Sequence, residues 1–110
     1  MIDGKCKMVI YVAKFAIAFD LDTDTLSKTY GAPSYNHSYD DIKMTLEKYG
    51  FLRQQGSVYF GNEKVDAVKT VMAARKLAKK YDWFTPSVRD IRMLRIEDDN
   101  DLMLAITDDD

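Results

Sequence analysis

This sequence predicts an α+β fold, in which two helices cover one face of a small antiparallel sheet. β-branched and aromatic residues gather in runs without helical spacing at residues 8–19, 51–60 and 88–96, which is typical of strands. Between these runs, apolar residues recur at helical spacing in residues 38–50 and 63–81. A chain of 110 residues is long enough for one domain and too short for two independent cores.

The first strand is expected over residues 8–19, MVIYVAKFAIAF, because this run is apolar on both faces and so suits a central position in the sheet. Lys14 interrupts the run, no small-residue cleavage site follows it, and it is too short to span a bilayer. We therefore expect a cytoplasmic protein without a signal peptide or a membrane partner. Asp20 ends this strand, so its carboxylate is expected at the C-terminal edge of the sheet.

The first long helix is expected after a short helical turn and a loop in residues 22–37, which contain a Gly and a Pro. Ser38 is its predicted N-cap, and Asp41, at the third helical position, completes a variant of the capping box. Gly50 supplies the left-handed residue that ends the helix. The predicted inward face consists of Ile42, Leu46 and Tyr49.

The middle of the chain predicts further strand structure and the longest helix. FLRQQGSVYF, residues 51–60, predicts either two short strands or one strand with a bulge at Gly56. The helix is expected over residues 63–81, after a turn and cap at Gly61 and Asn62. Its predicted apolar stripe consists of Val65, Val68, Val71, Met72, Ala74, Ala78 and Tyr81.

The final strand is expected at VRDIRMLRI, residues 88–96, after DWFTPS, which predicts a loop with two aromatic side chains. The residues expected to face inward are Val88, Ile91 and either Leu94 or Ile96. The order strand, helix, strand, strand, helix, strand is a modified ferredoxin-like β-α-β-β-α-β arrangement.

Charge is distributed unevenly along the chain, although the formal net charge is only −2. Residues 64–95 carry nine Lys or Arg and three Asp, a net charge of +6, whereas the residues after Ile96 include seven acids and no base. A solvated helix beside a frayed terminus is the simplest explanation. We expect a single domain over residues 1–110, with a flexible extension at residues 1–7 and an acidic tail at residues 99–110 that has room for one helical turn.

The chain contains one cysteine, Cys6, and one histidine, His37. These numbers exclude an internal disulfide, a four-cysteine zinc site and a His/Cys metal cluster within a single chain. A Cys–His protease pair remains formally open, although Cys6 falls in the N-terminal extension and His37 in a loop.

The Asp-x-Asp sequence at Asp20 and Asp22 suggests two kinds of site that the neighbouring residues exclude. The haloacid-dehalogenase-type phosphatases require Thr or Val four residues after the first Asp, where this chain has Asp24. A calcium loop would match the first three ligand positions, but Thr25 stands at its sixth position and Gly31 at its twelfth. The turn glycine and the bidentate glutamate are therefore missing.

A resemblance to a known family covers most of the chain, from Phe15 to Asp98. The segments FAIAFDLDTDTLSKTYG, YDDIKMTLEKYGF, QGSVYF and WFTPSVRDIRMLRIED, in this order, resemble the virulence-associated protein D family. That family is similar in fold to the small CRISPR-associated endoribonucleases of the spacer-acquisition complex. The resemblance implies an endoribonuclease that cuts single-stranded RNA such as mRNA, acts as a homodimer, and is toxin-like with a cognate antitoxin.

Three motif positions carry over from the family as catalytic residues: Asp20 in AFDLD, Ser57 in QGSVYF and Asp90 in SVRDIR. Cleaving a phosphodiester requires an activated oxygen nucleophile and stabilisation of the charge that builds on the phosphate. In a dimer, Asp20 and its symmetry mate could share one Mg²⁺, which activates water. Without a metal, Asp20 or Asp90 would act as general base on the RNA 2′-hydroxyl, and Ser57 would donate a hydrogen bond to phosphate.

RNA contacts are expected from basic and aromatic side chains. The candidate phosphate contacts are Arg53, Arg89, Arg92 and Lys76. The candidates for base stacking are Tyr59, Trp83 and Phe84, although aromatics near strand ends more often belong to the core.

Each catalytic candidate also has a purely structural interpretation. Asp20 would cap the following turn, Asp90 would form an ion pair with its neighbouring arginines, and Ser57 would accommodate a bulge beside Gly56. The competing hypothesis for the whole chain is a non-catalytic dimeric module of the same fold that binds RNA or protein.

Overall fold

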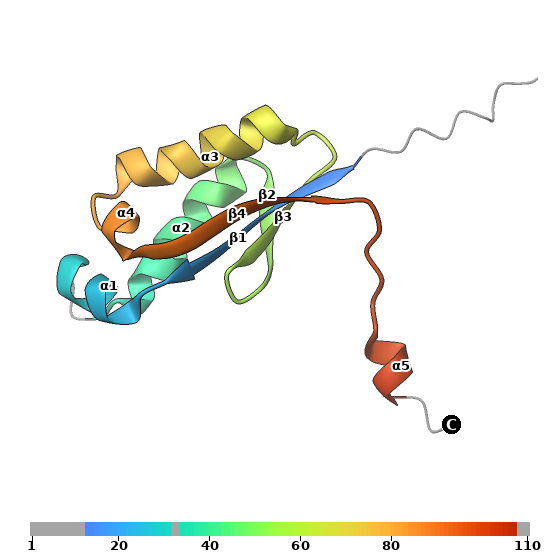
Figure 1. Cartoon of the computed structure of the whole chain (residues 1–110), viewed down its shortest axis with the longest axis horizontal. Helices are drawn as coiled ribbons and strands as arrows, with labels where there is room; N and C mark the ends of the chain where they lie inside the picture. The colour runs from blue at the N-terminus through green and yellow to red at the C-terminus, as the bar shows by residue number, and fades with distance from the viewer. Residues whose placement is uncertain (1–12, 32–33, 108–110) are drawn as a thin grey trace, which may run out of the picture.

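Four antiparallel strands form one sheet in the order β2-β3-β1-β4, and two long helices lie against one of its faces (Figure 1). The computed structural model describes residues 13–31 and 34–107. Its elements are β1 Lys14–Leu21, α1 Thr23–Thr29, α2 Asn36–Lys48, β2 Phe51–Gln55, β3 Val58–Gly61, α3 Ala67–Lys80, α4 Phe84–Ser87, β4 Val88–Ile96 and α5 Met103–Thr107. The predicted ferredoxin-like arrangement is confirmed, with β1 at the centre of the sheet and three short helices added.

The central strand β1 separates a covered face of the sheet from an open one. Ile17, Phe19 and Leu21 point into the core beneath the helices, whereas the alternate side chains, including Asp20, lie on the other face. From the helices, the core receives Ile42 and Leu46 of α2, as predicted, and Ala73 and Leu77 of α3. The register of the strands shows which residues lie on the open face. They are Leu52 of β2, Val58 and Phe60 of β3, Ala16, Ala18 and Asp20 of β1, and Asp90, Arg92 and Leu94 of β4.

The start of α2 differs from the prediction, whereas its end agrees. The helix follows Tyr35, so Ser38 lies inside it, fully buried, with its hydroxyl donating a hydrogen bond to the Tyr35 carbonyl. Asp41 takes no part in a capping box but accepts a hydrogen bond of 2.8 Å from the Tyr30 hydroxyl. Gly50, with φ +91°, ends the helix as predicted, because this backbone conformation suits a residue without a side chain.

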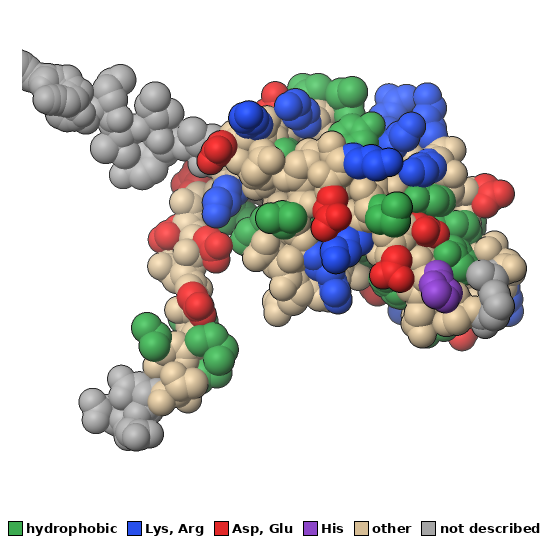
Figure 2. Space-filling view, turned by 180° about the vertical axis from the view of Figure 1, so that it is seen from behind, with side chains coloured by type: hydrophobic (Ala, Val, Ile, Leu, Met, Phe, Trp, Pro, Cys, Tyr) green, Lys and Arg blue, Asp and Glu red, His purple; other side chains and the backbone are tan. Residues whose placement is uncertain are grey.

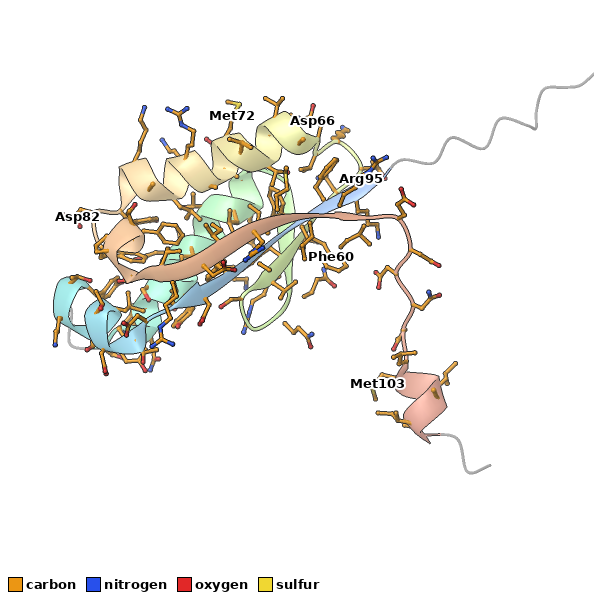
Figure 3. The ribbon with its side chains drawn as sticks, in the orientation of Figure 1. Phe60, Asp66, Met72, Asp82, Arg95 and Met103 are labelled. Carbon is orange, nitrogen blue, oxygen red and sulfur yellow. The ribbon has the colours of Figure 1, made fainter. Side chains whose placement is uncertain are left out.

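The helix α3 packs through a different stripe from the predicted one. It begins at Ala67 rather than at residue 63, because the Asp66 side chain accepts a hydrogen bond of 2.8 Å from the Lys69 N–H and caps the helix there. Its buried residues are Thr70, Ala73 and Leu77. The larger apolar residues Val68, Val71 and Met72 are exposed, and Figure 3 shows Met72 on the outer side of α3, away from the sheet and from Phe60.

The segments after α2 can be compared with the predictions for residues 51–60, for the last strand and for the segment DWFTPS. Residues 51–60 form two strands, β2 and β3, joined by a turn in which Gly56 has φ +48°. The bounds of β4 agree with the prediction, and Val88 packs against the core as expected. Ile91 and Leu94 are exposed, contrary to the prediction, because β4 is an edge strand. The segment DWFTPS is not a loop: Trp83 and Phe84 are buried, and a short helix, α4, follows Trp83.

Two predictions concern the ends of the chain and the end of the first strand. Residues 1–12, with the expected extension and Cys6, and residues 108–110 of the acidic tail lie outside the described residues. β1 runs on to Leu21, so Asp20 lies within the strand rather than ending it, contrary to the prediction.

After β4, residues 97–107 form an arm that extends away from the sheet and carries α5, the predicted additional helical turn (Figure 1). The apolar side chains of this arm, Leu102, Met103, Leu104 and Ile106, are all exposed. None of the helices formed by residues 13–31 and 34–107 has the length and apolar character needed to cross a membrane.

Candidate active site

The structure brings Asp20 and Asp90 together on the open face. Asp20 of β1 and Asp90 of β4 are directly opposite partners in the antiparallel pairing, so both side chains leave the sheet on the same side. Opposite side chains in such a pair have Cβ atoms about 5 Å apart, and like charges in this position are destabilising. Because both residues are exposed, the fold does not use this pair as a packing contact. Such a carboxylate pair is therefore a candidate for chemistry.

Arg92 holds one of the two carboxylates. Its Nε lies 3.1 Å from each of the Asp90 carboxylate oxygens, and its position two residues along β4 places it on the same face. This hydrogen bond, together with the charge of Asp90, raises the pKa of the Arg92 guanidinium. Within residues 13–31 and 34–107, Asp20 forms no salt bridge. The pair thus consists of one carboxylate that is oriented by an arginine and one that is left for a ligand.

The capping role that was considered for Asp20 belongs instead to Asp22. The Asp22 carboxylate accepts hydrogen bonds from the N–H groups of Asp24, at 3.1 Å, and Thr25, at 3.5 Å, and so caps α1. The Thr25 N–H is the main cause of the lowered pKa of Asp22. An Arg89 guanidinium nitrogen lies 3.8 Å from the same carboxylate. The two acids of the Asp-x-Asp sequence therefore have different roles, and only Asp20 faces the open side.

Ser57 lies one strand away from Asp20, in the turn between β2 and β3. Its carbonyl accepts a hydrogen bond of 3.1 Å from the Phe19 N–H. Extending the β1–β3 register by one residue places Ser57 level with Phe19, whose side chain points into the core, and a second residue places Gly56 level with Asp20. The structure thus brings the backbone of Ser57 beside Asp20 but does not align its hydroxyl with the carboxylate pair.

The four predicted RNA-binding residues do not form one group. Arg92 lies beside the carboxylate pair, paired with Asp90, whereas the contact that Arg89 makes is with Asp22, the cap of α1. Arg53 lies on β2, two strands from Asp20, with its Nε donating a hydrogen bond of 2.8 Å to the Gly56 carbonyl. Lys76 is exposed on α3, on the covered side of the sheet, where Figure 2 shows Lys and Arg side chains gathered.

The three aromatic residues considered for base stacking are not available for it. Tyr59, Trp83 and Phe84 are all at least 94% buried and belong to the core cluster. Trp83 stacks on Tyr81, with ring centroids 4.9 Å apart, and meets the Tyr30 ring edge-on at 5.1 Å. The structural interpretation of these aromatics is therefore the correct one.

A divalent metal ion would find only part of its ligands in one chain. Asp20 and Asp90 offer carboxylate oxygens, which are the ligands that Mg²⁺ prefers. Among the residues that the structure describes, no three His, Cys, Asp or Glu side chains gather closely enough to hold a metal ion. A Mg²⁺ ion at this pair would require further ligands from a second copy of the chain, from RNA phosphate or from water.

Sequence reasoning missed a group of polar residues between α2 and β2, of which only Arg53 was expected to bind RNA. Lys43 and Glu47 of α2 line a cavity together with Arg53 and the three residues that follow it. Two segments separated by the chain reversal at Gly50 contribute these side chains, so no single motif could have shown them as a set.

Comparison with known proteins gives consistent matches over most of the chain. The family model described as CRISPR associated protein Cas2 matches residues 13–103. A protein named Endoribonuclease VapD 2, from Riemerella anatipestifer, is 47% identical over 93 residues, which cover 84% of this chain and 99% of that protein. The Endoribonuclease VapD homolog of Helicobacter pylori is 47% identical over 92 residues, covering 84% and 95%. Endoribonuclease VapD of Dichelobacter nodosus is 46% identical over 92 residues, covering 84% and 96%.

Proposed function

This chain belongs to the Cas2 family and, within it, to the VapD proteins, and on this basis we propose that it is an endoribonuclease that cuts single-stranded RNA at the Asp20–Asp90 pair. Family membership gives the reaction class, which is hydrolysis or transesterification of an RNA phosphodiester. The observation that locates the reaction is the juxtaposition of two exposed carboxylates on neighbouring strands, with an arginine fixed beside them.

Asp20 is the residue that handles the proton of the attacking oxygen. It is the member of the pair without a guanidinium partner among the described residues, so its carboxylate can accept a proton from a water molecule or from the RNA 2′-hydroxyl. Arg92 lies where it can stabilise negative charge on the phosphate, while Asp90 fixes its orientation through both carboxylate oxygens. When bound, Mg²⁺ would supply an activated water and neutralise phosphate charge.

The active form is a homodimer that buries the open face. Leu52 and Leu94 are exposed on this face, and Val58 and Phe60 beside them are half-buried. The face is therefore apolar in the part level with Ala16, four residues along β1 from Asp20, rather than polar throughout. An antiparallel sheet that is stable with one face in water normally has polar side chains there. A second copy would cover this apolar surface, bring the two Asp20 carboxylates toward each other and complete the ligands for a shared Mg²⁺.

The cellular role follows from the substrate. The enzyme acts in the cytoplasm on mRNA, in the manner of a toxin that a cognate antitoxin restrains. The apolar outer side of α3, with Val68, Val71 and Met72 exposed among basic residues, supports contact with such a protein.

The test is cleavage of end-labelled single-stranded RNA by the wild-type protein, Asp20→Asn and Asp22→Asn, each with Mg²⁺ and with EDTA. We expect Asp20→Asn to lower kcat by 10²- to 10⁴-fold, as loss of a general base does. Asp22→Asn is the matched control, because Asn also caps helices well and the same chemical change is made two residues away. Equal cutting by both variants would reject Asp20 as the base, and no cutting by the wild type would reject the activity. The EDTA lanes decide between metal-bound water and 2′-hydroxyl attack.

A further inference from the structure

We propose that the cavity between α2 and β2 is a phosphate subsite for a nucleotide of the RNA strand next to the bond that is cut. The proposal rests on the proposed function, since it assigns a second part of the same substrate. The cavity is open and has a volume of about 630 Å³, which is within the range of sites that hold small molecules. It is lined by Lys43, Glu47, Leu52, Arg53, Gln54, Gln55 and Gly56.

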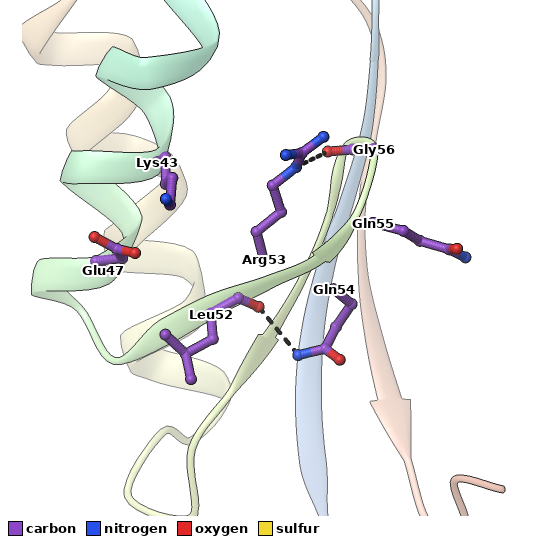
Figure 4. A pocket seen from close by; sticks show the side chains of 7 residues that line it. All are labelled: Lys43, Glu47, Leu52, Arg53, Gln54, Gln55 and Gly56. Carbon is purple, nitrogen blue, oxygen red and sulfur yellow. Dashed lines mark hydrogen bonds between the residues drawn. The ribbon is translucent and has the colours of Figure 1, made fainter. Parts of the chain in front are cut away.

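Two cations from different elements converge in this cavity. Figure 4 shows Lys43 of α2 and Arg53 of β2 in the space between the helix and the strand, with Glu47 one helical turn from Lys43. The Arg53 Nε donates a hydrogen bond of 2.8 Å to the Gly56 carbonyl, which fixes the guanidinium and leaves its terminal nitrogens for a ligand. Glu47 is the single carboxylate among the lining residues, so the cavity carries a net positive charge. A phosphate diester is the ligand that this combination suits.

The other lining residues suit the sugar and base of the same nucleotide. Gln54 and Gln55 lie on the opposite side of β2 from Arg53 in Figure 4, and each amide has both a donor and an acceptor. Because β2 is an edge strand, a nucleotide whose phosphate lies at Arg53 would reach these amides with its sugar or base by passing the free edge of the strand.

The turn of the β2–β3 hairpin lies between the cavity, which is on the helix-covered side of the sheet, and the candidate active site, which is on the open face. Gly56 lines the cavity, and the next residue, Ser57, is hydrogen-bonded to the backbone of Phe19, next to Asp20. Arg53 lies two strand spacings from β1, about 10 Å, and its register partner there is Ile17, three residues or about 10 Å along the strand from Asp20, so the separation is roughly 14 Å. A stacked strand advances about 3.4 Å per nucleotide, so about four nucleotides bridge this distance. Apart from Gly56 and its two chain neighbours, no atom of the described residues lies within 4 Å of a Cβ built on Gly56, so this side of the turn is open.

The test compares Lys43→Gln with Lys69→Gln and Glu47→Gln. Lys69→Gln removes the same charge from an exposed position at the start of α3, outside the cavity, and Glu47→Gln removes the opposite charge within it. The measurements are kcat and KM on end-labelled RNA oligonucleotides that are shortened one nucleotide at a time from either side of the cut bond. The salt dependence of RNA binding is measured in parallel by fluorescence anisotropy, with each of these substitutions in an Asp20→Asn background.

We expect Lys43→Gln to raise KM five- to tenfold with kcat unchanged, Glu47→Gln to lower KM about twofold, and Lys69→Gln to have no effect. The slope of log affinity against log salt should fall by about 0.7 in Lys43→Gln, as for one lost contact to a single strand. The increase in KM caused by Lys43→Gln should disappear when the RNA is shortened from one side of the cut bond. It should remain when the RNA is shortened from the other side.

Four results distinguish this proposal from the activity itself. Cleavage that is the same in Lys43→Gln as in Lys69→Gln, or a defect that persists on every shortened RNA, would overturn the subsite and leave the nuclease assignment. No cleavage, with a salt slope that falls only in Lys43→Gln, would support the subsite and overturn the activity. No cleavage and equal salt slopes would overturn both.

Discussion

The two faces of β1 differ in what their side chains do, although the same eight residues supply both. On the covered face, Ile17, Phe19 and Leu21 are buried beneath α2 and α3 and take part in one core cluster. On the open face, Asp20 stands beside Asp90 with no helix above it. The covered face determines whether the chain folds, whereas the open face can carry a repulsive carboxylate pair because no packing depends on it. Alternation along one strand thus separates stability from chemistry.

The strongest test of this separation uses two adjacent residues of β2. Phe51 is 0% exposed in the core, and Leu52, on the open face, is 62% exposed. We expect Phe51→Ala to lower the free energy of unfolding by about 3–5 kcal/mol, as removal of a buried aromatic does. Leu52→Ala should cost no more than about 0.5 kcal/mol. Urea unfolding at one fixed protein concentration measures both, and comparable losses would show that the open face also stabilises the single chain.

A charge on the open face should separate association from folding. Leu94 lies opposite Ala16 on this face and is 45% exposed. We expect Leu94→Glu to weaken the proposed dimer by about 2–3 kcal/mol, because it places an unpaired charge in an apolar interface. Sedimentation velocity over a range of concentrations measures dissociation, and circular dichroism checks that the variant is folded. The matched control is Val68→Glu, on the exposed side of α3. A dimer that is unchanged in Leu94→Glu would place the interface elsewhere.

The covered face was predictable from sequence only where one apolar stripe was available. The run at Ile42 and Leu46 gave α2 the correct orientation, and Gly50 gave its end. For α3 the sequence offers two stripes, and the structure buries Leu77 together with the smaller Thr70 and Ala73. Small residues allow close approach to the sheet, and the Thr70 hydroxyl is satisfied within the helix by the Asp66 carbonyl. Periodicity alone cannot rank two such stripes.

For the open face, the sequence predicted which residues matter but not which of them are neighbours. The motifs identified Asp20 and Asp90, but only the register of β1 with β4 makes them neighbours. A shift of one residue would send one of them to the other face, and no local pattern fixes that register. The sequence also could not assign the cap to Asp22 rather than Asp20, because both lie within one residue of the end of β1 at Leu21, which is within the usual uncertainty of element bounds.

A third test concerns the end of β1, where Asp22 caps α1, and its expected effect on the free energy of unfolding is smaller. Asp22 caps α1 and lies 3.8 Å from the Arg89 guanidinium. We expect Asp22→Ala to lower the free energy of unfolding by about 1 kcal/mol, the usual value of a lost N-cap, and Asp22→Asn to lose much less. Thermal unfolding monitored by circular dichroism provides the comparison. If the two variants were equally destabilised, the charge interaction with Arg89 rather than the cap would be the main contribution.

The smallest expected effect lies at the rim of the covered face and depends on pH. Burial, together with the 2.8 Å hydrogen bond to Asp41, raises the pKa of Tyr30 to about 12, compared with about 10 in an unfolded chain. Below pH 10 Tyr30 is protonated in both states, so its contribution to stability is complete. Between pH 10 and 12 the unfolded chain loses this proton first, and the contribution is lost.

Tyr30→Phe removes this titration together with the hydrogen bond, which is worth on the order of 1 kcal/mol. We therefore expect the wild type to be more stable than Tyr30→Phe at pH 8 and the difference to shrink as the pH rises from 10 toward 12. Urea unfolding of both proteins at pH 8, 10 and 11 measures it. A difference in the free energy of unfolding that stays constant over this range would mean that folding does not shift the pKa of Tyr30. The hydroxyl would then be open to solvent rather than held against Asp41.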